Sequence, residues 1–345
     1  MGGKALNKYG VFTERKNTEE FLRIGSELQE RLGFDLGVRT AIVTCYRTKA
    51  DHGDLDLLVK MEEPLNPFGF SWKNYIEKAL KPQAINSNGG VYSFDYQGFQ
   101  VDIIPIPEAK WETALIYFSY DPLGNIMGKT YHKFGLSYGW EGLFYKYRNP
   151  HGTNSENILL TNDARRIFEF GGYDYDRYLK GFDTLEEIFR FCIESKYFDA
   201  EMFQMENLKS LDKKRNRKRG SYHLFLNYIK DNGINTKYSF SEDKDWYLET
   251  INLCFPEAVL MVKLRELQLK DEKAKAIADK FNGELAMEWI PGLKGKELGE
   301  AIGDFKQWWG EYFETFILGC DIRDIKDNFI AIYNKITLTK KKLNG

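Results

Sequence analysis

Apolar positions near the start of the chain follow the spacing of an amphipathic helix. In TEEFLRIGSELQERL, residues 18–32, the apolar side chains recur every three or four residues. Thr18 is suited to cap the start of this helix, and Gly33 follows where a helix would end. The next two runs, RTAIVTCYR and DLDLLVKM, are short and β-prone, and a polar turn with Gly53 separates them. The pattern therefore predicts a helix followed by two strands.

Further strands are predicted before residue 110. Residues 71–81 have a helical pattern, and the turn signal Asn88-Gly89-Gly90 comes after them. The runs VYSFDYQG and FQVDIIPIP then read as two strands joined near Gly98. The predicted fold class is α/β (α+β), with a small mixed or antiparallel sheet followed by a mainly helical C-terminal region.

The pattern changes at residue 111, where a largely helical stretch begins and a turn-rich aromatic passage follows to about Arg148. In DTLEEIFRFCIESKYF, Asp183 or Thr184 can cap a helix that carries one apolar stripe. We therefore divide the chain into three regions, 1–110, 111–180 and 181–345.

Composition narrows the class of protein. With 345 residues and 43% apolar content, the chain can bury a core and form two or three domains. Its net charge of −2 argues against indiscriminate coating of nucleic acid. The four cysteines form no CxxC pair, so neither a zinc site nor a disulfide framework is indicated. No apolar run is long enough for a membrane span or a signal peptide, and we expect a cytoplasmic protein.

Two carboxylates stand at the start of the run DLDLLVKM. Successive side chains of a strand alternate sides, so Asp54 and Asp56 share one face. Two like charges so close repel each other unless a cation lies between them. Carboxylate oxygens suit Mg²⁺ or Mn²⁺, and no His/Cys set that would favour zinc lies nearby.

A third acid, Asp102, stands among β-branched residues in FQVDIIPIP, where an unpaired charge is costly. If its strand lies beside the first, Asp102 joins Asp54 and Asp56 in a cage that can hold two metal ions about 4 Å apart. The alternative is that the acidic pair begins a solvent-facing strand and Asp102 pairs with a lysine.

Two acids on one strand and a third on another, after the turn TCYRTKADHG, resemble the nucleotidyltransferase superfamily. This superfamily includes DNA polymerase beta, the family X polymerases, and the CCA-adding and poly(A) enzymes. The resemblance implies a palm at 1–110 and phosphoryl transfer from a nucleoside triphosphate to a hydroxyl group, with two Mg²⁺ ions or possible Mn²⁺ substitutes as cofactors. It implies that Asp54 and Asp56 bind both ions, and that Asp102 binds the catalytic ion and helps to deprotonate the attacking hydroxyl.

The family's Gly-Ser turn is replaced here by Thr44-Cys45, which the resemblance places beside the triphosphate. Arg47 matches an arginine that commonly follows in family X proteins, and its guanidinium can bind a phosphate through two hydrogen bonds. A surface ion pair between Arg47 and Asp51 is the alternative.

The stretch IYFSYDPLGNIMGK resembles the family X thumb segment that lines the sugar and base pocket, within the region 111–180. The resemblance implies that Tyr117 and Phe118 pack against the sugar, that Asn125 approaches the base, and that Lys129 lies near the templating side. Tyr120-Asp121 stands where the family has Gly-Ser. Tyr117 and Phe118 could instead be ordinary helix core.

The region 181–345 contains the basic run KKRNRKR, which can neutralise nucleic-acid phosphates, and Tyr222 after it could stack on a base. A solvated basic loop is the alternative. FNGELAMEWIPGLKGKELGEAIGDF predicts a turn and a helix with Leu298, Ile302 and Phe305 on one side, faintly similar to a C-terminal element of tRNA nucleotidyltransferases. The candidate nucleic-acid-binding residues are Lys213, Lys214, Arg215, Arg217, Lys218 and Arg219.

These features predict a metal-dependent nucleotidyltransferase. It would add nucleotides from NTP or dNTP to the 3′ hydroxyl of a nucleic acid, an RNA or tRNA end or a DNA primer, and release pyrophosphate. One alternative is a nucleotidyltransferase that modifies a protein or a small molecule. The other is a catalytically silent nucleic-acid-binding protein with the same fold.

Overall fold

The computed structural model describes residues 3–61, 69–152 and 155–343. The chain forms two compact units. The first comprises Met1–Lys146 and Asn157–Leu260, and the second comprises Tyr147–Glu156 and Met261–Gly345. The division of the chain into regions 1–110, 111–180 and 181–345 remains a prediction.

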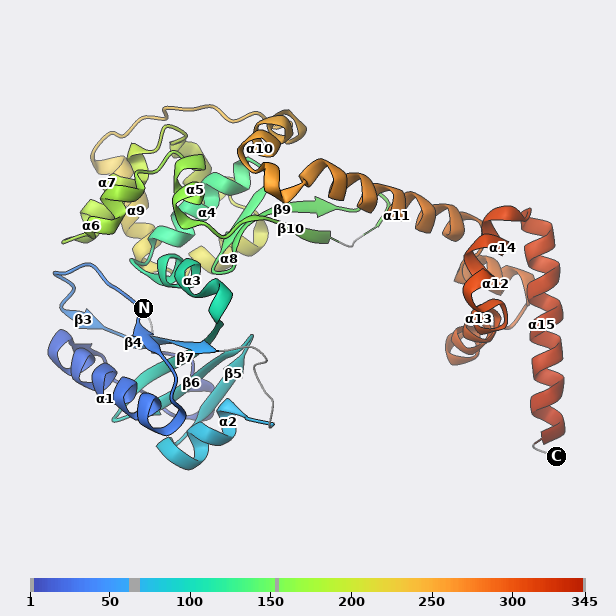
Figure 1. Ribbon diagram of the computed structural model, residues 1–345, viewed down its shortest axis with the longest axis horizontal. Helices are drawn as coiled ribbons and strands as arrows, with labels where there is room; N and C mark the ends of the chain where they lie inside the picture. The colour runs from blue at the N-terminus through green and yellow to red at the C-terminus, as the bar shows by residue number, and fades with distance from the viewer. Residues whose placement is uncertain (1–2, 62–68, 153–154, 344–345) are drawn as a thin grey trace. The chain divides into compact units, whose positions relative to one another are not determined.

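The first unit contains a five-stranded mixed sheet in the order β2-β4-β7-β6-β5 (Figure 1). Its two central strands, β4 and β7, are parallel, and all other neighbours are antiparallel. The strands are β2 (Thr40–Ile42), β4 (Asp54–Met61), β5 (Ile85–Asn88), β6 (Val91–Tyr96) and β7 (Phe99–Pro107). The predicted strands at DLDLLVKM, VYSFDYQG and FQVDIIPIP are thus confirmed.

Helices α1 (Thr18–Leu36) and α2 (Trp72–Tyr75) cover one face of this sheet (Figure 1). A π-helical turn, Ile76–Leu80, continues α2. Leu55, Leu57 and Val59 of β4 point to this face and share a buried core with α1 and α2. Their alternation along the strand follows from the period of two in a β-strand.

The limits of α1 differ from those predicted. Asn17, not Thr18, is the N-cap, and its side chain accepts a hydrogen bond from the Glu20 N–H (2.9 Å). The helix also continues past Gly33 and ends at Gly37, which has the left-handed backbone (φ 65°) that closes helices. A glycine inside a helix weakens it only modestly, so packing on the sheet carries α1 one turn further.

The opposite face of the sheet is covered at one end by α3 (Trp111–Phe118). Trp111 and Ala114 of α3 pack on Leu58 and Ile104 in a second buried cluster. Leu58 points to the same face as Asp54 and Asp56, which lie four and two residues earlier on β4. The apolar part of this face is therefore covered, and the acidic part lies at the start of the strand.

The rest of the first unit is mainly helical, and the aromatic passage near residue 140 forms a β-hairpin where the sequence indicated turns. Two short strands, β1 (Lys16–Asn17) and β3 (Asp51–His52), pair near the acids. A further sheet has the order β10-β9-β8, and the end of β9 and the start of β10 belong to the second unit. The elements are α4 (Leu123–Lys133), β8 (Leu136–Gly139), β9 (Gly142–Arg148), β10 (Ser155–Thr161), α5 (Ala164–Phe170), α6 (Tyr175–Lys180), α7 (Leu185–Glu194), α8 (Ser210–Asn216), α9 (Gly220–Asp231) and α10 (Leu248–Cys254).

The second unit has its own helical core, in which Phe281, Phe305 and Phe329 are buried together. The predicted helix with Leu298, Ile302 and Phe305 on one side is confirmed as α13. The helices are α11 (Leu260–Lys280), α12 (Gly283–Trp289), α13 (Gly295–Trp309), α14 (Phe313–Gly319) and α15 (Ile322–Leu343). Short 3₁₀ turns occupy Asn7–Tyr9, Glu108–Lys110, Ala200–Phe203, Met205–Asn207, Asp245–Tyr247, Pro256–Ala258 and Gly310–Tyr312.

The predicted fold class, a small mixed sheet with helices followed by a mainly helical region, is confirmed. Within the described residues, no helix is both long enough and apolar enough to cross a membrane.

Candidate active site

The register of the parallel pair β4 and β7 brings the three predicted acids together. The Cα atoms of Asp56 and Asp102 are direct partners, and Asp54 is the partner of Gln100. Side chains at paired positions of neighbouring strands lie on the same face of a sheet. Asp54, Asp56 and Asp102 therefore lie on one face, on the adjacent strands that the sequence hypothesis required.

Asp54 and Asp102 each accept a hydrogen bond. The Gly3 N–H donates to Asp54 Oδ2 (3.3 Å), and Gln100 Nε2 donates to Asp102 Oδ1 (3.0 Å). A Cβ at Gly3 would lie 2.3 Å from the carbonyl oxygen of Gly53, so only glycine permits this close approach. The N-terminal segment thus helps to orient Asp54.

The three carboxyls are half-buried, and none of the salt bridges within the described ranges involves them. Burial raises the pKa of Asp56 well above its usual range, and the charges of Asp54 and Asp102 raise that pKa further. Burial, followed by the charge of Asp54, raises the pKa of Asp102 to about 6. The pKa of Asp54 is also raised, chiefly by burial.

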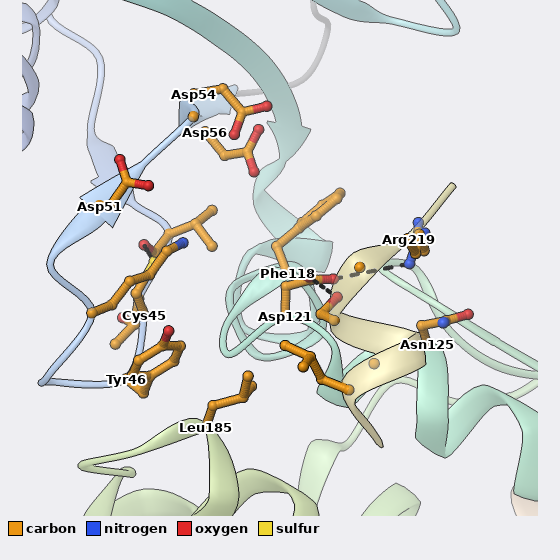
Figure 2. Close-up of a pocket in the computed structure, with 18 of the residues that line it drawn as sticks. Cys45, Tyr46, Asp51, Asp54, Asp56, Phe118, Asp121, Asn125, Leu185 and Arg219 are labelled. Carbon is orange, nitrogen blue, oxygen red and sulfur yellow. Dashed lines mark hydrogen bonds and ion pairs between the residues drawn. The ribbon is translucent and has the colours of Figure 1, made fainter. Parts of the chain in front are cut away.

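A cavity of about 820 Å³ opens beside Asp54 and Asp56, and Asp102 is not among its lining residues. Figure 2 shows both acids at the start of β4, with Phe118, Asp121 and Arg219 across from them. The cations on its wall are Arg15, Lys49, Arg215, Lys218 and Arg219. The cavity therefore presents carboxylates from the sheet and positive charges from other elements, a combination suited to a metal ion with a phosphorylated ligand.

Most of the predicted nucleotide-contacting residues lie on this cavity. The lining includes the Thr44-Cys45 turn as well as Tyr117, Phe118 and Asn125. Tyr117 and Phe118 are both half-buried, and their rings meet edge to face with centroids 5.4 Å apart. Neither ring is enclosed as an ordinary core residue would be, so both can contact a ligand.

The other two predicted nucleotide contacts, Arg47 and Lys129, do not line the cavity. Arg47 forms an ion pair with Asp183 and donates to the carbonyl oxygen of Lys180. The alternative that Arg47 pairs with Asp51 is wrong, because Arg47 pairs with Asp183 and Asp51 pairs with Arg15. Lys129 is only 6% exposed, and its Nζ lies 2.8 Å from an Asp212 carboxylate oxygen. Arg47 and Lys129 are therefore each already engaged in an ion pair.

Only part of the basic run KKRNRKR lines the cavity. Arg215, Lys218 and Arg219 line the cavity, whereas Lys213, Lys214 and Arg217 do not. The expectation that Tyr222 could stack on a base is wrong. Its side chain is 0% exposed, and its O–H donates to the carbonyl oxygen of Phe203 (2.6 Å).

Sequence reasoning missed Asp121 and Lys49 as site residues. Asp121 lines the cavity, accepts a hydrogen bond from Ser221 Oγ (3.1 Å) and lies 3.9 Å from Arg219 (Figure 2). Lys49 also lines the cavity, and its charge opposes the rise in the pKa of Asp56. The signal for Asp121 was its place three residues after Phe118; for Lys49 it was its place in the turn between Thr44-Cys45 and Asp54.

The acids fit a hard divalent cation. Their oxygens are the ligands that Mg²⁺ and Mn²⁺ prefer, and a bound cation would offset the uncompensated charge that raises their pKa values. In residues 3–61, 69–152 and 155–343, no three His, Cys, Asp or Glu side chains form a ready metal cage. Like charges repel, so a bound cation would let these carboxylates lie closer together.

Comparison with known proteins gives a distant structural likeness only. No protein-family model matches the chain, and no curated protein matches it. A ternary gap complex of Leishmania infantum polymerase beta is similar at 21% identity and a TM-score of 0.32, over 41% of this chain and 52% of that one. A ternary P/T complex of the same polymerase has the same identity, TM-score and share of this chain, and 59% of its own chain is covered. The chain thus spans little more than half the length of these structures.

Proposed function

We propose that this protein is a metal-dependent nucleotidyltransferase that extends the 3′ hydroxyl of a nucleic acid. NTP or dNTP would be the nucleotide donor, and pyrophosphate would be released. One observation carries the proposal: Asp54, Asp56 and Asp102 share one face of adjacent parallel strands, and the first two open on a cavity lined by cations.

The acids would hold the metal and the reacting hydroxyl. Asp54 and Asp56 would bind both ions, with Asp102 on the catalytic one. Bound Mg²⁺ or Mn²⁺ would supply Lewis-acid stabilisation of the charge that develops on the phosphate oxygens. Asp102 would also help to deprotonate the attacking hydroxyl.

The reaction exchanges one bond for another. The 3′ oxygen forms a bond to the α-phosphorus, and the bond from that phosphorus to the leaving pyrophosphate breaks. Lys49 and Arg219, both on the cavity wall, would bind the anionic phosphates. Tyr117 and Phe118 would pack on the sugar, and Asn125 would contact the base.

The experiment that tests this proposal is a primer-extension panel with the full chain. Labelled RNA, labelled DNA and tRNA lacking its 3′ end are incubated with Mg²⁺ and each NTP or dNTP in turn. We expect incorporation that depends on a primer. Nucleotide transfer to a protein or small molecule without a primer would overturn the polymer assignment, and binding without any transfer would leave a silent nucleic-acid-binding protein.

The basic run gives a prediction about salt. Lys218→Ala removes a cation from the cavity wall, so we expect weaker primer binding and a log Kd against log salt slope smaller by about 0.7 for a single strand. Lys214→Ala makes the same charge change off the cavity wall and should alter the slope less. Fluorescence anisotropy at several salt concentrations measures both slopes. Equal effects of the two substitutions would show that cavity lining does not decide which cations bind the primer.

A further inference from the structure

Asn216 is the one uncharged residue of the run KKRNRKR, and it is turned inward. Its side chain is 0% exposed, although it stands at the end of α8 among six cations. Its Oδ1 accepts a hydrogen bond from Asn125 Nδ2 at 3.1 Å. Asn125 lies on α4 and lines the cavity (Figure 2). The buried amide therefore connects α8 to a residue of the candidate site.

A second contact fixes the same two helices. Lys129 of α4 and Asp212 of α8 form an ion pair, with Lys129 Nζ 2.8 Å from Asp212 Oδ2. The Lys129 side chain is buried and that of Asp212 is half-buried. Lys129 follows Asn125 by four residues, and Asp212 precedes Asn216 by four, so each pair lies on one side of its helix. The two contacts are successive cross-links between α4 and α8. They fix the position of the Asn125 side chain relative to the basic run.

Asn216 carries a cost that its single hydrogen bond does not remove. Its Nδ2 is buried and has no hydrogen-bond partner among the described residues. An unpartnered buried amide opposes folding, and an apolar side chain of similar volume would avoid this cost. The hydrogen bond from Asn125 is the interaction that offsets this cost within the part of the chain that the structure describes.

We propose that Asn216 is a positioning residue for nucleobase recognition, acting through the amide of Asn125. The bond to Asn216 takes one N–H of Asn125 and fixes the amide plane. One N–H and the carbonyl oxygen of Asn125 are left for the hydrogen-bonding edge of a base. This inference rests on the proposed function, because it assigns the base contact of that reaction to Asn125.

The first test replaces the amide with an apolar side chain of similar size. Asn216→Leu should leave the melting temperature unchanged or raise it, because the unpartnered donor is removed. The nucleotide KM should rise about fivefold to tenfold, with a smaller change in kcat and weaker discrimination among the four bases. Asn216→Asp keeps an acceptor oxygen for Asn125 Nδ2 and should restore most of the KM. Leu211 of α8 is 84% exposed, so Leu211→Ala is the control and should change neither the melting temperature nor the nucleotide KM.

A double-mutant cycle separates positioning from a direct role. In an Asn125→Ala background, Asn216→Leu should raise KM no further, because the amide it positions is absent. Full additivity of the two effects, or a lower melting temperature with KM unchanged, would overturn the inference and leave Asn216 a structural residue.

Nucleotide binding gives a readout that does not need turnover. The Kd of a fluorescent nucleotide, measured with Mg²⁺ by titration, should change as KM does in the same variants. If the wild-type chain binds the nucleotide but extends no primer, the proposed function fails while this inference is still decided by Kd. If the wild-type chain binds no nucleotide, both are overturned.

Discussion

Asp56→Asn is expected to lower nucleotide transfer at least about a thousandfold while making the metal-free chain more stable. The carboxylate is a proposed ligand of both ions, and metal stabilisation of the transition state supplies several kcal/mol, at about 1.4 kcal/mol for each tenfold in rate. Asp56 is half-buried, and desolvation followed by the charges of Asp54 and Asp102 raises its pKa well above the usual range. An uncharged amide of the same shape removes that desolvation cost. Primer extension and calorimetric melting measure the two effects.

The matched control for this substitution is Asp51→Asn. Asp51 lines the same cavity, but it is exposed and already paired with Arg15. The same chemical change there should alter activity by no more than severalfold, since a surface ion pair contributes only about 0–1 kcal/mol. Retention of activity in Asp56→Asn within tenfold of wild type would eliminate the metal-dependent reaction and favour the silent binding protein.

In the metal-free chain, ionisation of Asp102 is expected to cost stability as the pH rises from about 4 through about 6, measured as a fall in the free energy of unfolding of wild type relative to Asp102→Asn. This comparison is needed because His132, whose pKa burial lowers to about 4, adds stability over the same pH range in both chains. The carboxyl of Asp102 has a pKa of about 6 in the folded chain against 3.8 as its ordinary value. Between these values the folded state binds more protons than the unfolded state, so the free energy of unfolding falls as pH rises. The loss is complete above the folded pKa and amounts to about 3 kcal/mol for this group alone. Asp54 and Asp56 shift in the same direction.

Mg²⁺ should reverse this loss, and only where the carboxyls are ionised. At pH 8 it would bind the folded chain through Asp54, Asp56 and Asp102 and raise the melting temperature by mass action. At pH 5 protons compete for the same oxygens, and the increase should be smaller. Melting with Mg²⁺ or with EDTA at both pH values measures the difference.

Asp56→Asn provides the control for the metal effect, because it removes a proposed ligand without adding charge. The Mg²⁺-dependent increase at pH 8 should shrink strongly in this variant. An equal increase in wild type and variant, or one of equal size at pH 5 and pH 8, would mean that Mg²⁺ acts elsewhere on the chain. A free energy of unfolding that rises in wild type relative to Asp102→Asn between pH 4 and pH 6 would contradict the direction of the Asp102 pKa.

Local properties of the chain were predictable because they depend on near neighbours in sequence. The alternation of DLDLLVKM predicted that Asp54 and Asp56 share one face, and it also explains why Leu55 and Leu57 enter the core below α1. The partner of Asp102 required more. That β7 lies parallel to β4 with Asp102 beside Asp56 is a long-range pairing, which the pattern of one strand cannot specify.

The basic run shows where sequence reasoning ended. KKRNRKR indicated a positive surface, but charge alone does not say which side of a helix meets a neighbour. The packing of α8 on α4 sends Arg215 to the cavity wall, buries Asn216 and pairs Lys129 with Asp212.

The sequence by itself determined the helices and strands near the acids, the shared face of Asp54 and Asp56, and the excess of positive charge near residue 215. Only the tertiary structure decided that Asp102 lies beside Asp56, that Asp121 and Lys49 line the cavity, and that Asn216 contacts Asn125. The physical reason is one of range. Backbone periodicity acts over a few residues, whereas burial and side-chain contacts depend on which distant segments pack together.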